Sequence, residues 1–452
     1  MNDVAPAQDN SLAELDRLAS IAADMVRRCR AQGASEADAV ATIERGLAVN
    51  VRLGDVETVE HTRDRGIAVT VLFGKRKGSA STADLAPASI DKTIEQACAI
   101  ARHTEPDAAH GLPDAALLAR DAPDLDLWHP WPITAPEAIA LALEIENAGR
   151  GADARIGNSE GASVQSGETL TAYANSLDFT GTERSTRHSL SCSLIAGHGD
   201  GMQRDYWYDV VRRAGDFTPA ATVGTRAAER AVARLGAQSL TTRECPVLFA
   251  PETARTLVGH FLSAVSGGAL YRRASFLLDR LGTAVFPAHV EITERPHIPR
   301  GHGSSAFDAE GVATRDSDLV RGGVLSRYIL GSYSARRLGM TTTGNAGGVH
   351  NIVVRSGPDG FEDLLRRMER GLVVTELMGQ GVSLVTGDYS RGASGFWVED
   401  GAIAFPVEEI TIAGNLRDLF NGIVAIGADV DPRSHVLTGS ILLERMTVAG
   451  EA

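Results

Sequence analysis

The sequence predicts an α+β protein of two domains, an N-terminal domain of helices and antiparallel sheet over residues 1–220 and a β-rich C-terminal domain over residues 221–452. Three observations support this prediction. A chain of 452 residues is long enough for more than one hydrophobic core. The N-terminal half shows the order helix, meander, helix twice, which suggests a duplicated unit although no letters repeat. The C-terminal half alternates short apolar runs with glycine-rich polar segments, as strands joined by shaped loops do.

The first unit is expected to begin with a helix. Ser11 and Glu14 have the spacing of a capping box, apolar residues then recur at helical spacing, and Gly33 supplies a stop. From residue 43 the period changes to two, which predicts an antiparallel strand pair over residues 43–53 and 67–73. A second helix should follow around residues 89–102.

The second unit follows an extended connection over residues 105–132, which is rich in Pro, Asp and Ala. Thr134 and Glu137, with Pro136 in the first turn, predict a helix that ends near Gly149. Strands are then expected over residues 170–175, 189–196 and 205–212. A helix over residues 218–236 starts close to the predicted domain boundary.

The C-terminal domain is expected to begin with a buried strand over residues 246–250 and a helix over residues 252–266. Gly267 and Gly268 should end this helix. Further strands are predicted at 351–355, 382–386, 395–399 and 402–405, with a helix at 361–370 and mainly antiparallel sheets.

Composition excludes several classes of function. With 44 Lys and Arg against 58 Asp and Glu, the net charge of −14 argues against a nucleic-acid-binding protein, which would need a basic face. No apolar run approaches the ~20 residues that span a bilayer, and the N-terminus has no secretory pattern. Four scattered cysteines fit a reducing compartment, so we expect a cytoplasmic protein.

Five polar, glycine-rich segments in the C-terminal half predict loops held around a shared site. They read SAVSGGALYRRASFLLD, SSAFDAEGVATRD, SARRLGMTTTGNAGG, VTGDYSRGASGFWVE and EITIAGNLRD. These segments closely resemble the TldD/PmbA family of zinc-dependent peptidases, also known as modulators of DNA gyrase, and within it the PmbA (TldE) branch. The likeness covers essentially the whole chain and is strongest from Pro251 to Leu416. It implies a subunit of a cytoplasmic proteolytic heterodimer whose catalytic partner is TldD-like.

One departure from the catalytic branch decides the expected role. That branch carries His-Glu-x-x-x-His on a helix, where this chain has Arg255, Thr256 and, at the last position, His260. Arginine is a permanent cation and threonine has no useful basicity near neutral pH. The family's cysteine ligand also has no counterpart, because the four cysteines all precede residue 252. We therefore expect a degenerate motif, with no catalytic residue and no metal in this chain, and zinc in the partner. His260 is more readily explained as a partly buried structural histidine.

An independent metal site is the weaker alternative. His289, His297 and His302 lie near acidic residues, but spacings of eight and five along a Pro-rich loop do not place them on one helix face.

Candidate residues for a peptide cleft come from the same polar segments. Asp308, Glu310 and Arg315 lie in one turn-rich segment, where Arg315 could hold a carboxylate with two hydrogen bonds or could belong to a salt-bridged hairpin. Asn345 lies in a glycine-rich turn that either serves the fold or presents backbone to an extended peptide. Asp388 is the last of the candidate residues for the peptide cleft.

Two functions remain open at this point. The favoured one is a PmbA-type subunit that walls the peptide cleft of a metallopeptidase complex acting on small or unfolded peptides, with a TldD-like partner and a homodimer as an option in isolation. The alternative is a non-catalytic protein that binds peptides or regulators without a peptidase partner. The sequence reveals neither the substrate nor the face that docks the partner.

Overall fold

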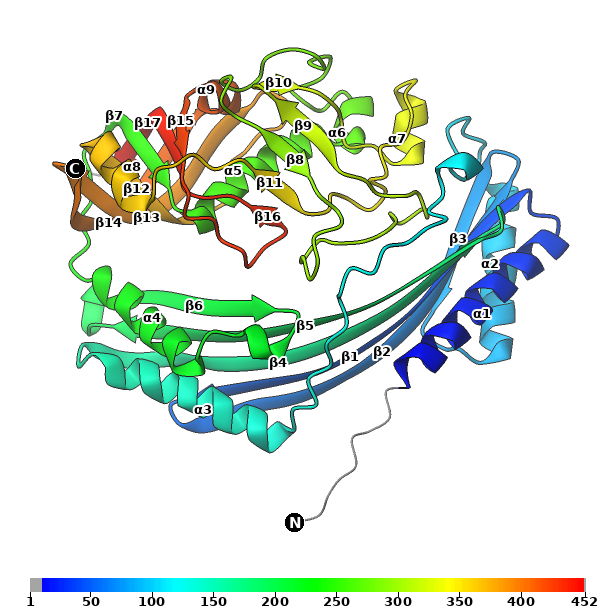
Figure 1. Ribbon diagram of the computed structural model, residues 1–452, viewed down its shortest axis with the longest axis horizontal. Coiled ribbons are helices and arrows are strands. Elements are labelled where there is room, and N and C mark those ends of the chain that lie inside the picture. The colour runs from blue at the N-terminus through cyan, green and yellow to red at the C-terminus, as the bar shows by residue number, and fades with distance from the viewer. Residues whose placement is uncertain (1–9, 451–452) are drawn as a thin grey trace.

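The computed structural model describes residues 10–450 and confirms the α+β class. Its N-terminal part is a six-stranded antiparallel sheet with the order β3-β2-β1-β4-β5-β6, whose long strands curve together (Figure 1). The strands are β1 (Glu36–Arg52), β2 (Asp55–Phe73), β3 (Arg76–Thr82), β4 (Ile156–Asn175), β5 (Phe179–Ala196) and β6 (Gln203–Val211). The period-two segments therefore mark real strands, and these extend well beyond the predicted bounds.

Four helices cover one face of this sheet: α1 (Ser11–Ala31), α2 (Pro87–His103), α3 (Ala135–Ala152) and α4 (Ala220–Ala233) (Figure 1). Alternate small residues of β1 such as Ala37 and Ala39 are buried beneath them. Helices α3 and α4 approach closely, since a Cβ on Gly224 would lie 2.0 Å from the carbonyl oxygen of Ile145. Helix α4 packs on α3, β5 and β6, although it begins at the expected domain boundary.

The two halves of this layer have the same element order. Helix α1, strands β1 to β3 and helix α2 are matched by α3, β4 to β6 and α4, and the halves join where β1 pairs with β4. The capping box of Thr134 and Glu137 is present in full. The one predicted at Ser11 is wrong, because Ser11 is already helical and the residue before the helix is Asn10. The Ser11 hydroxyl instead accepts a hydrogen bond from Arg184.

The connection between α2 and α3 is extended, as predicted, apart from the short 3-10 turn η1 (Ala115–Leu117). It runs between the curved sheet and the C-terminal part (Figure 1). Arg336 fixes it there by donating to the carbonyl oxygens of Ala109 and Gly111. Two more 3-10 turns, η2 (Gly199–Gly201) and η3 (Ala214–Asp216), flank β6.

The C-terminal part contains two further sheets. The larger has the order β14-β13-β12-β7-β17-β15, and the smaller β10-β9-β8-β11-β16. Their strands are β7 (Arg243–Phe249), β8 (Ile292–Glu294), β9 (Ser317–Arg321), β10 (Val324–Leu325), β11 (Ile352–Val354), β12 (Gly371–Met378), β13 (Asp388–Glu399), β14 (Ala402–Asn415), β15 (Ile423–Ile426), β16 (Val436–Leu437) and β17 (Ile441–Gly450). The helices are α5 (Pro251–Ala264), α6 (Gly267–Tyr271), α7 (Ser332–Arg337), α8 (Phe361–Met368) and α9 (Leu416–Asn421).

Two predictions for this part are wrong, and one buried strand was missed. Residues 382–386 form no strand, because Ser383 and Asp388 close a turn through their backbone groups and only Val382 bridges to Tyr389. Strand β12, which begins directly after the predicted helix and is buried over its first four residues, was not predicted. Gly267 begins α6 instead of only ending α5, and its missing Cβ leaves room for Ser334, which would otherwise lie 2.2 Å away.

Helix α5 lies within one large hydrophobic cluster that both C-terminal sheets share. Within residues 10–450, no helix is long and apolar enough to cross a membrane.

Candidate functional site

Helix α5 carries Arg255, Thr256 and His260, the three residues of the degenerate motif. Pro251 and Glu252 occupy its first turn, where proline lacks only an unneeded donor and a carboxylate complements the helix dipole. Its inner face buries Ala254, Leu257, Phe261 and other apolar side chains. Burial of this face leaves Arg255 and Thr256 on the side toward the N-terminal layer, where Arg255 contacts Tyr208 of β6.

Arg255 and Thr256 are both engaged in contacts of their own. The Arg255 guanidinium donates to the Tyr208 hydroxyl at 3.0 Å and lies 3.7 Å from the Asp431 carboxylate. The Thr256 hydroxyl donates to the carbonyl oxygen of Thr253 at 2.7 Å, one turn back in the helix. Neither side chain is a base near neutral pH, because the guanidinium stays protonated and a hydroxyl oxygen is too weakly basic to activate water.

His260 lies one turn further along α5, against the Tyr389 ring at 5.9 Å between centroids. Its Nε2 atom is buried and has no hydrogen-bond partner among residues 10–450. Burial lowers the pKa of His260, and the Arg391 cation lowers it further. The imidazole is therefore neutral near pH 7 and packs as a ring.

A cavity of about 610 Å³ opens between β6 and the start of α5. Trp207 and Tyr208 line it from the N-terminal layer, and residues 429–433 line it from the loop before β16. The Arg433 guanidinium lies 4.0 Å from the Trp207 ring centroid and 4.4 Å from that of Tyr208. Arg226 and Arg230 also lie over Trp207, at 5.5 and 5.2 Å.

Carboxylates hold these guanidinium groups in place. Arg433 donates to Asp431 at 2.8 Å and to the backbone carbonyl of Tyr208 at 2.9 Å, and it lies 3.4 Å from Glu252. Arg230 lies 3.6 Å from the same Glu252 carboxylate. The result is a rigid polar wall that joins the two layers of the molecule, with planar cations and aromatic rings facing a space large enough for a peptide side chain.

Strand β6 forms the outer edge of its sheet, yet its backbone is not free to pair. The amides of Tyr206 and Val210 donate to the side chains of Asp205 and Asp209, at 2.7 and 2.8 Å. The carbonyl oxygen of Tyr208 accepts a hydrogen bond from Arg433. An extended chain could not add to β6 here without displacing these contacts.

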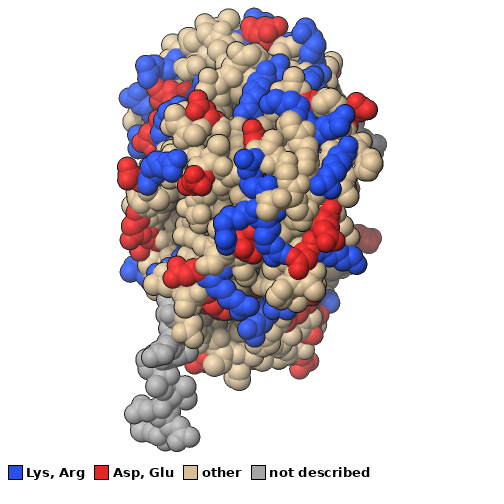
Figure 2. Space-filling model, turned by 90° about the vertical axis from the view of Figure 1, so that its right-hand side faces the viewer, with Lys and Arg blue, Asp and Glu red and all other residues tan. Residues whose placement is uncertain are grey.

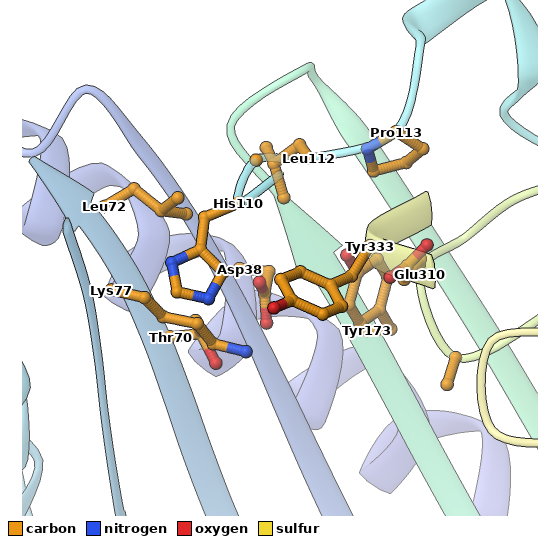
Figure 3. Close-up of a pocket in the computed structure, with 12 residues that line it drawn as sticks. Asp38, Thr70, Leu72, Lys77, His110, Leu112, Pro113, Tyr173, Glu310 and Tyr333 are labelled. Atoms are coloured by element: carbon orange, nitrogen blue, oxygen red, sulfur yellow. The ribbon is translucent and has the colours of Figure 1, made fainter. Parts of the chain in front are cut away.

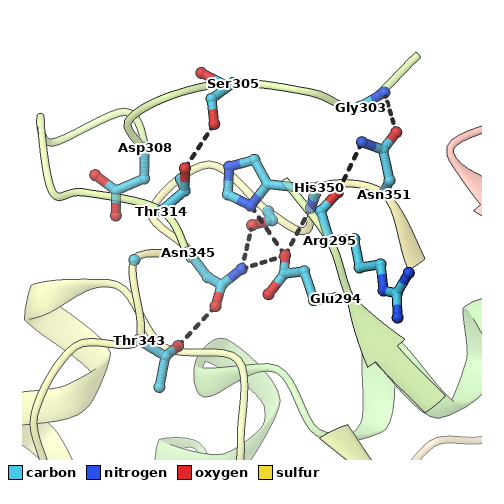
Figure 4. A network of polar contacts seen from close by, with 12 residues as sticks. Glu294, Arg295, Gly303, Ser305, Asp308, Thr314, Thr343, Asn345, His350 and Asn351 are labelled. Atoms are coloured by element: carbon cyan, nitrogen blue, oxygen red, sulfur yellow. Dashed lines mark hydrogen bonds and ion pairs between the residues drawn. The ribbon is translucent and has the colours of Figure 1, made fainter. Parts of the chain in front are cut away.

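A second polar cluster surrounds Glu294, at the end of β8 (Figure 4). Glu294 is 2% exposed and accepts from the amide nitrogen of Asn345 at 2.8 Å and from the backbone amide of His350 at 2.7 Å. Arg327 and the His350 ring also contact it. Burial disfavours its charge, but His350 and Arg327 hold the pKa of Glu294 below its ordinary value. Asn345, one of the predicted cleft residues, is buried in this cluster.

The other predicted cleft residues lie in two places. Asp308 is buried and accepts from the backbone amides of Glu310, Val312 and Ala346, at 2.9, 3.0 and 2.9 Å, so it orders the loop beside Asn345. Burial raises the pKa of Asp308 to about 6, although the hydrogen bonds from these three amides act to lower it. Glu310 accepts from the amide of Ser332 at 3.0 Å.

Arg315 is exposed, close enough to lower the pKa of Arg327 in the Glu294 cluster. Asp388 is separate: it starts β13 next to Tyr389 and bonds to Thr386 and Asn415.

The histidines of the Pro-rich loop do not form a shared site. His297 bonds to the Thr314 hydroxyl at 3.0 Å, His302 is largely buried, and His289 is exposed. In the part of the chain that the structure describes, no group of three or more His, Cys, Asp or Glu residues is arranged to hold a metal ion.

The aromatic and arginine cavity was not foreseen from the sequence. Its residues come from β6, α4, α5 and the loop at 429–433, which are separated by up to about two hundred positions, and only tertiary structure joins them. The one local signal was the aromatic run Tyr206-Trp207-Tyr208.

Comparisons with known proteins agree with this architecture. Three family models match the chain: PmbA/TldA metallopeptidase domain 1 over residues 37–101, the central domain over residues 128–235 and the C-terminal domain over residues 242–450. A metalloprotease PmbA homolog of Haemophilus influenzae is 46% identical over 97% of this chain and 96% of its own. Metalloprotease PmbA of Escherichia coli O157:H7 is 47% identical over 90% of each.

The likeness extends to solved structures and to the other branch of the family. A protein of Bacteroides thetaiotaomicron named as a modulator of DNA gyrase superposes with a TM-score of 0.91 at 26% identity, over 96% of this chain and 99% of its own. A metalloprotease TldD homolog of H. influenzae is 25% identical over 52% of this chain and 49% of its own.

Proposed function

The chain belongs to the PmbA/TldD family of metallopeptidases, in its PmbA (TldE) branch, and we propose that it is the non-cutting subunit of a two-subunit peptidase. In this proposal a TldD-like partner supplies zinc and cleaves small or unfolded peptides in the cytoplasm. This chain walls the peptide cleft and orders the partner's site. One organism, H. influenzae, has relatives of both types, which supports a pairing of the two branches.

The observation that carries the proposal is the environment of Arg255. By the family resemblance, a histidine ligand would stand at this position. Here a guanidinium bonded to Tyr208 and next to Asp431 fills the space, and its positive charge would repel a metal cation. Thr256 bonds within the helix, and the chain has no cysteine after Cys245. The residues present do not fit a catalytic zinc, which needs about three protein ligands and an open position.

The cavity beside Trp207 gives this chain a means of binding peptide. Guanidinium groups can hold carboxylates and backbone carbonyls, while the aromatic rings accept apolar side chains. Because the β6 edge is closed by Asp205, Asp209 and Arg433, we place substrate contacts in the cavity and not along that strand.

Reconstitution tests the proposal. The purified chain is incubated with zinc and an unstructured peptide, alone and with a TldD-type subunit, and new peptide termini are counted by mass spectrometry. We expect cleavage only when the partner is present, co-elution of the two subunits on gel filtration, and less than one zinc per isolated chain. Strong cleavage by the chain alone, lost in His260→Ala, would refute the proposal. Peptide binding without co-elution would favour a peptide- or regulator-binding protein that works without a peptidase.

A further inference from the structure

A second cavity, of about 470 Å³, lies at the opposite end of the curved sheet from the one beside Trp207 and shares no lining residue with it. Strands β1, β2 and β3 form its floor, the connection at residues 110–113 covers it, and Glu310 and Tyr333 reach it from the C-terminal part (Figure 3). Its volume is that of a small-molecule site, for which roughly 300–1,000 Å³ is usual.

Three charged side chains face this cavity: Asp38 on β1, Lys77 on β3 and Glu310 (Figure 3). Within residues 10–450, none of them has a side chain of opposite charge within 4.0 Å. Thr70 lies opposite Asp38 on the neighbouring strand β2, and the Glu310 carboxylate accepts a hydrogen bond from the Ser332 amide. Buried carboxylates elsewhere in the described residues are either paired with arginine, as Glu294 and Asp431 are, or accept several backbone amides, as Asp308 does.

Asp38 and Glu310 are half-buried, whereas Lys77 is exposed. A half-buried carboxylate without a charged partner is disfavoured, and the ammonium group of a ligand would remove that cost. Burial raises the pKa of Asp38 to about 7; Lys77 acts against this rise and Glu310 adds to it. Two carboxyl groups and one ammonium group therefore border a single space, and the combination matches a molecule that carries both charges.

We propose that this cavity binds a small zwitterion, a free amino acid or dipeptide, with its ammonium group at Asp38 and Glu310 and its carboxylate at Lys77. Tyr173 and Tyr333 form walls for the ligand's carbon atoms. The Tyr333 hydroxyl donates to Asp107 at 2.7 Å, which fixes the ring. The face of the molecule that lies on the right in Figure 1 carries Lys and Arg side chains interspersed with Asp and Glu (Figure 2).

The site includes Glu310, one of the candidate cleft residues from the sequence, but it is separate from the cavity beside Trp207 where substrate contacts are proposed, so it can be tested without a peptidase partner. Isothermal titration calorimetry of the full chain with L-alanyl-L-alanine should give saturable binding. N-acetyl-alanyl-alanine and alanyl-alanine amide each remove one terminal charge and should bind about tenfold or more weakly, the loss expected for one charged hydrogen bond.

Protein variants locate the binding. Asp38→Asn and Lys77→Met should each weaken binding of the dipeptide by a similar factor. Asp64→Asn and Lys92→Met, which change exposed residues on β2 and α2, should leave it unchanged. Near pH 7 the wild type should release protons on binding, seen as a buffer-dependent heat, and Asp38→Asn should abolish this release.

Absence of binding at millimolar dipeptide would overturn the proposal, as would binding of both singly blocked dipeptides as tightly as alanyl-alanine itself. Binding that survives both Asp38→Asn and Lys77→Met would place the ligand elsewhere and would also overturn it. If a variant failed to fold, the blocked dipeptides would still decide the question on the wild-type protein.

Discussion

Replacement of Arg433 by alanine should destabilise the contact between the two layers of the molecule. The Arg433 side chain is 11% exposed and donates twice to Asp431, at 2.8 and 3.1 Å. It also bonds to the Tyr208 carbonyl at 2.9 Å and lies over Trp207. The variant would leave Asp431, itself 6% exposed, with Arg255 at 3.7 Å as its cation and with the backbone amide of residue 433 at 3.0 Å.

The size of the effect follows from these contacts. Breaking a buried ion pair by removing one partner costs about 3–5 kcal/mol, because the other charge stays buried. Since Arg255 and Arg230 still lie near Asp431 and Glu252, we expect the lower end, about 3 kcal/mol. Arg433→Lys should lose less, because an ammonium group keeps the charge but cannot form the two-pronged contact.

Urea unfolding followed by tryptophan fluorescence measures this loss as a shift of the midpoint at unchanged slope. Arg445→Ala is the matched control, because Arg445 is 70% exposed and its pair with Glu244, at 3.6 Å, should contribute at most about 1 kcal/mol. A loss in Arg433→Ala equal to that in Arg445→Ala would show that the network is not a buried clamp and would refute the reasoning.

Further predictions concern helix packing and pH. Gly224→Ala should lower the melting temperature, because the new Cβ would lie 2.0 Å from the Ile145 carbonyl oxygen. Gly259→Ala has open space around it and should stabilise α5 by up to about 1 kcal/mol. Equal effects of the two substitutions would argue against close packing of α3 and α4. Burial, with Arg212 and Arg187, lowers the pKa of His302 from 6.5 to about 4. The folded protein therefore holds His302 in its neutral form. The stability that this contributes is complete above pH 6.5 and is lost as the pH falls toward 4. In His302→Gln, the urea midpoint should change less with pH over this range. Glu294 has a lowered pKa, so its contribution is present above its unfolded pKa and lost in acid, and Glu294→Gln should destabilise the chain at pH 7 but much less at pH 3.

Local patterns in the sequence predicted the elements well where one physical signal dominated. The alternation from residue 43 reflects strands with one face under helices, and the Thr134 capping box reflects groups three residues apart that bond to each other. The prediction failed at Ser11, whose hydroxyl bonds to the distant Arg184, and at residues 382–386, where backbone bonds within a turn replace a strand. Strand β12 was missed because a central strand buried on both faces carries no alternation.

For the candidate site too, some features follow from the sequence and others only from the fold. The chemical identity of Arg255 and Thr256 is a matter of sequence, and it alone carries the expectation that this subunit does not cut. Which groups hold Arg255 was decided by the fold, since Tyr208 and Asp431 come from distant segments. The sheet brings Asp38 of β1 and Lys77 of β3 to one cavity, and Glu310 joins them only because the C-terminal part folds over the sheet. Sequence fixes what each side chain can do, and long-range packing fixes what it faces, because contacts between remote residues leave no periodic trace in the chain.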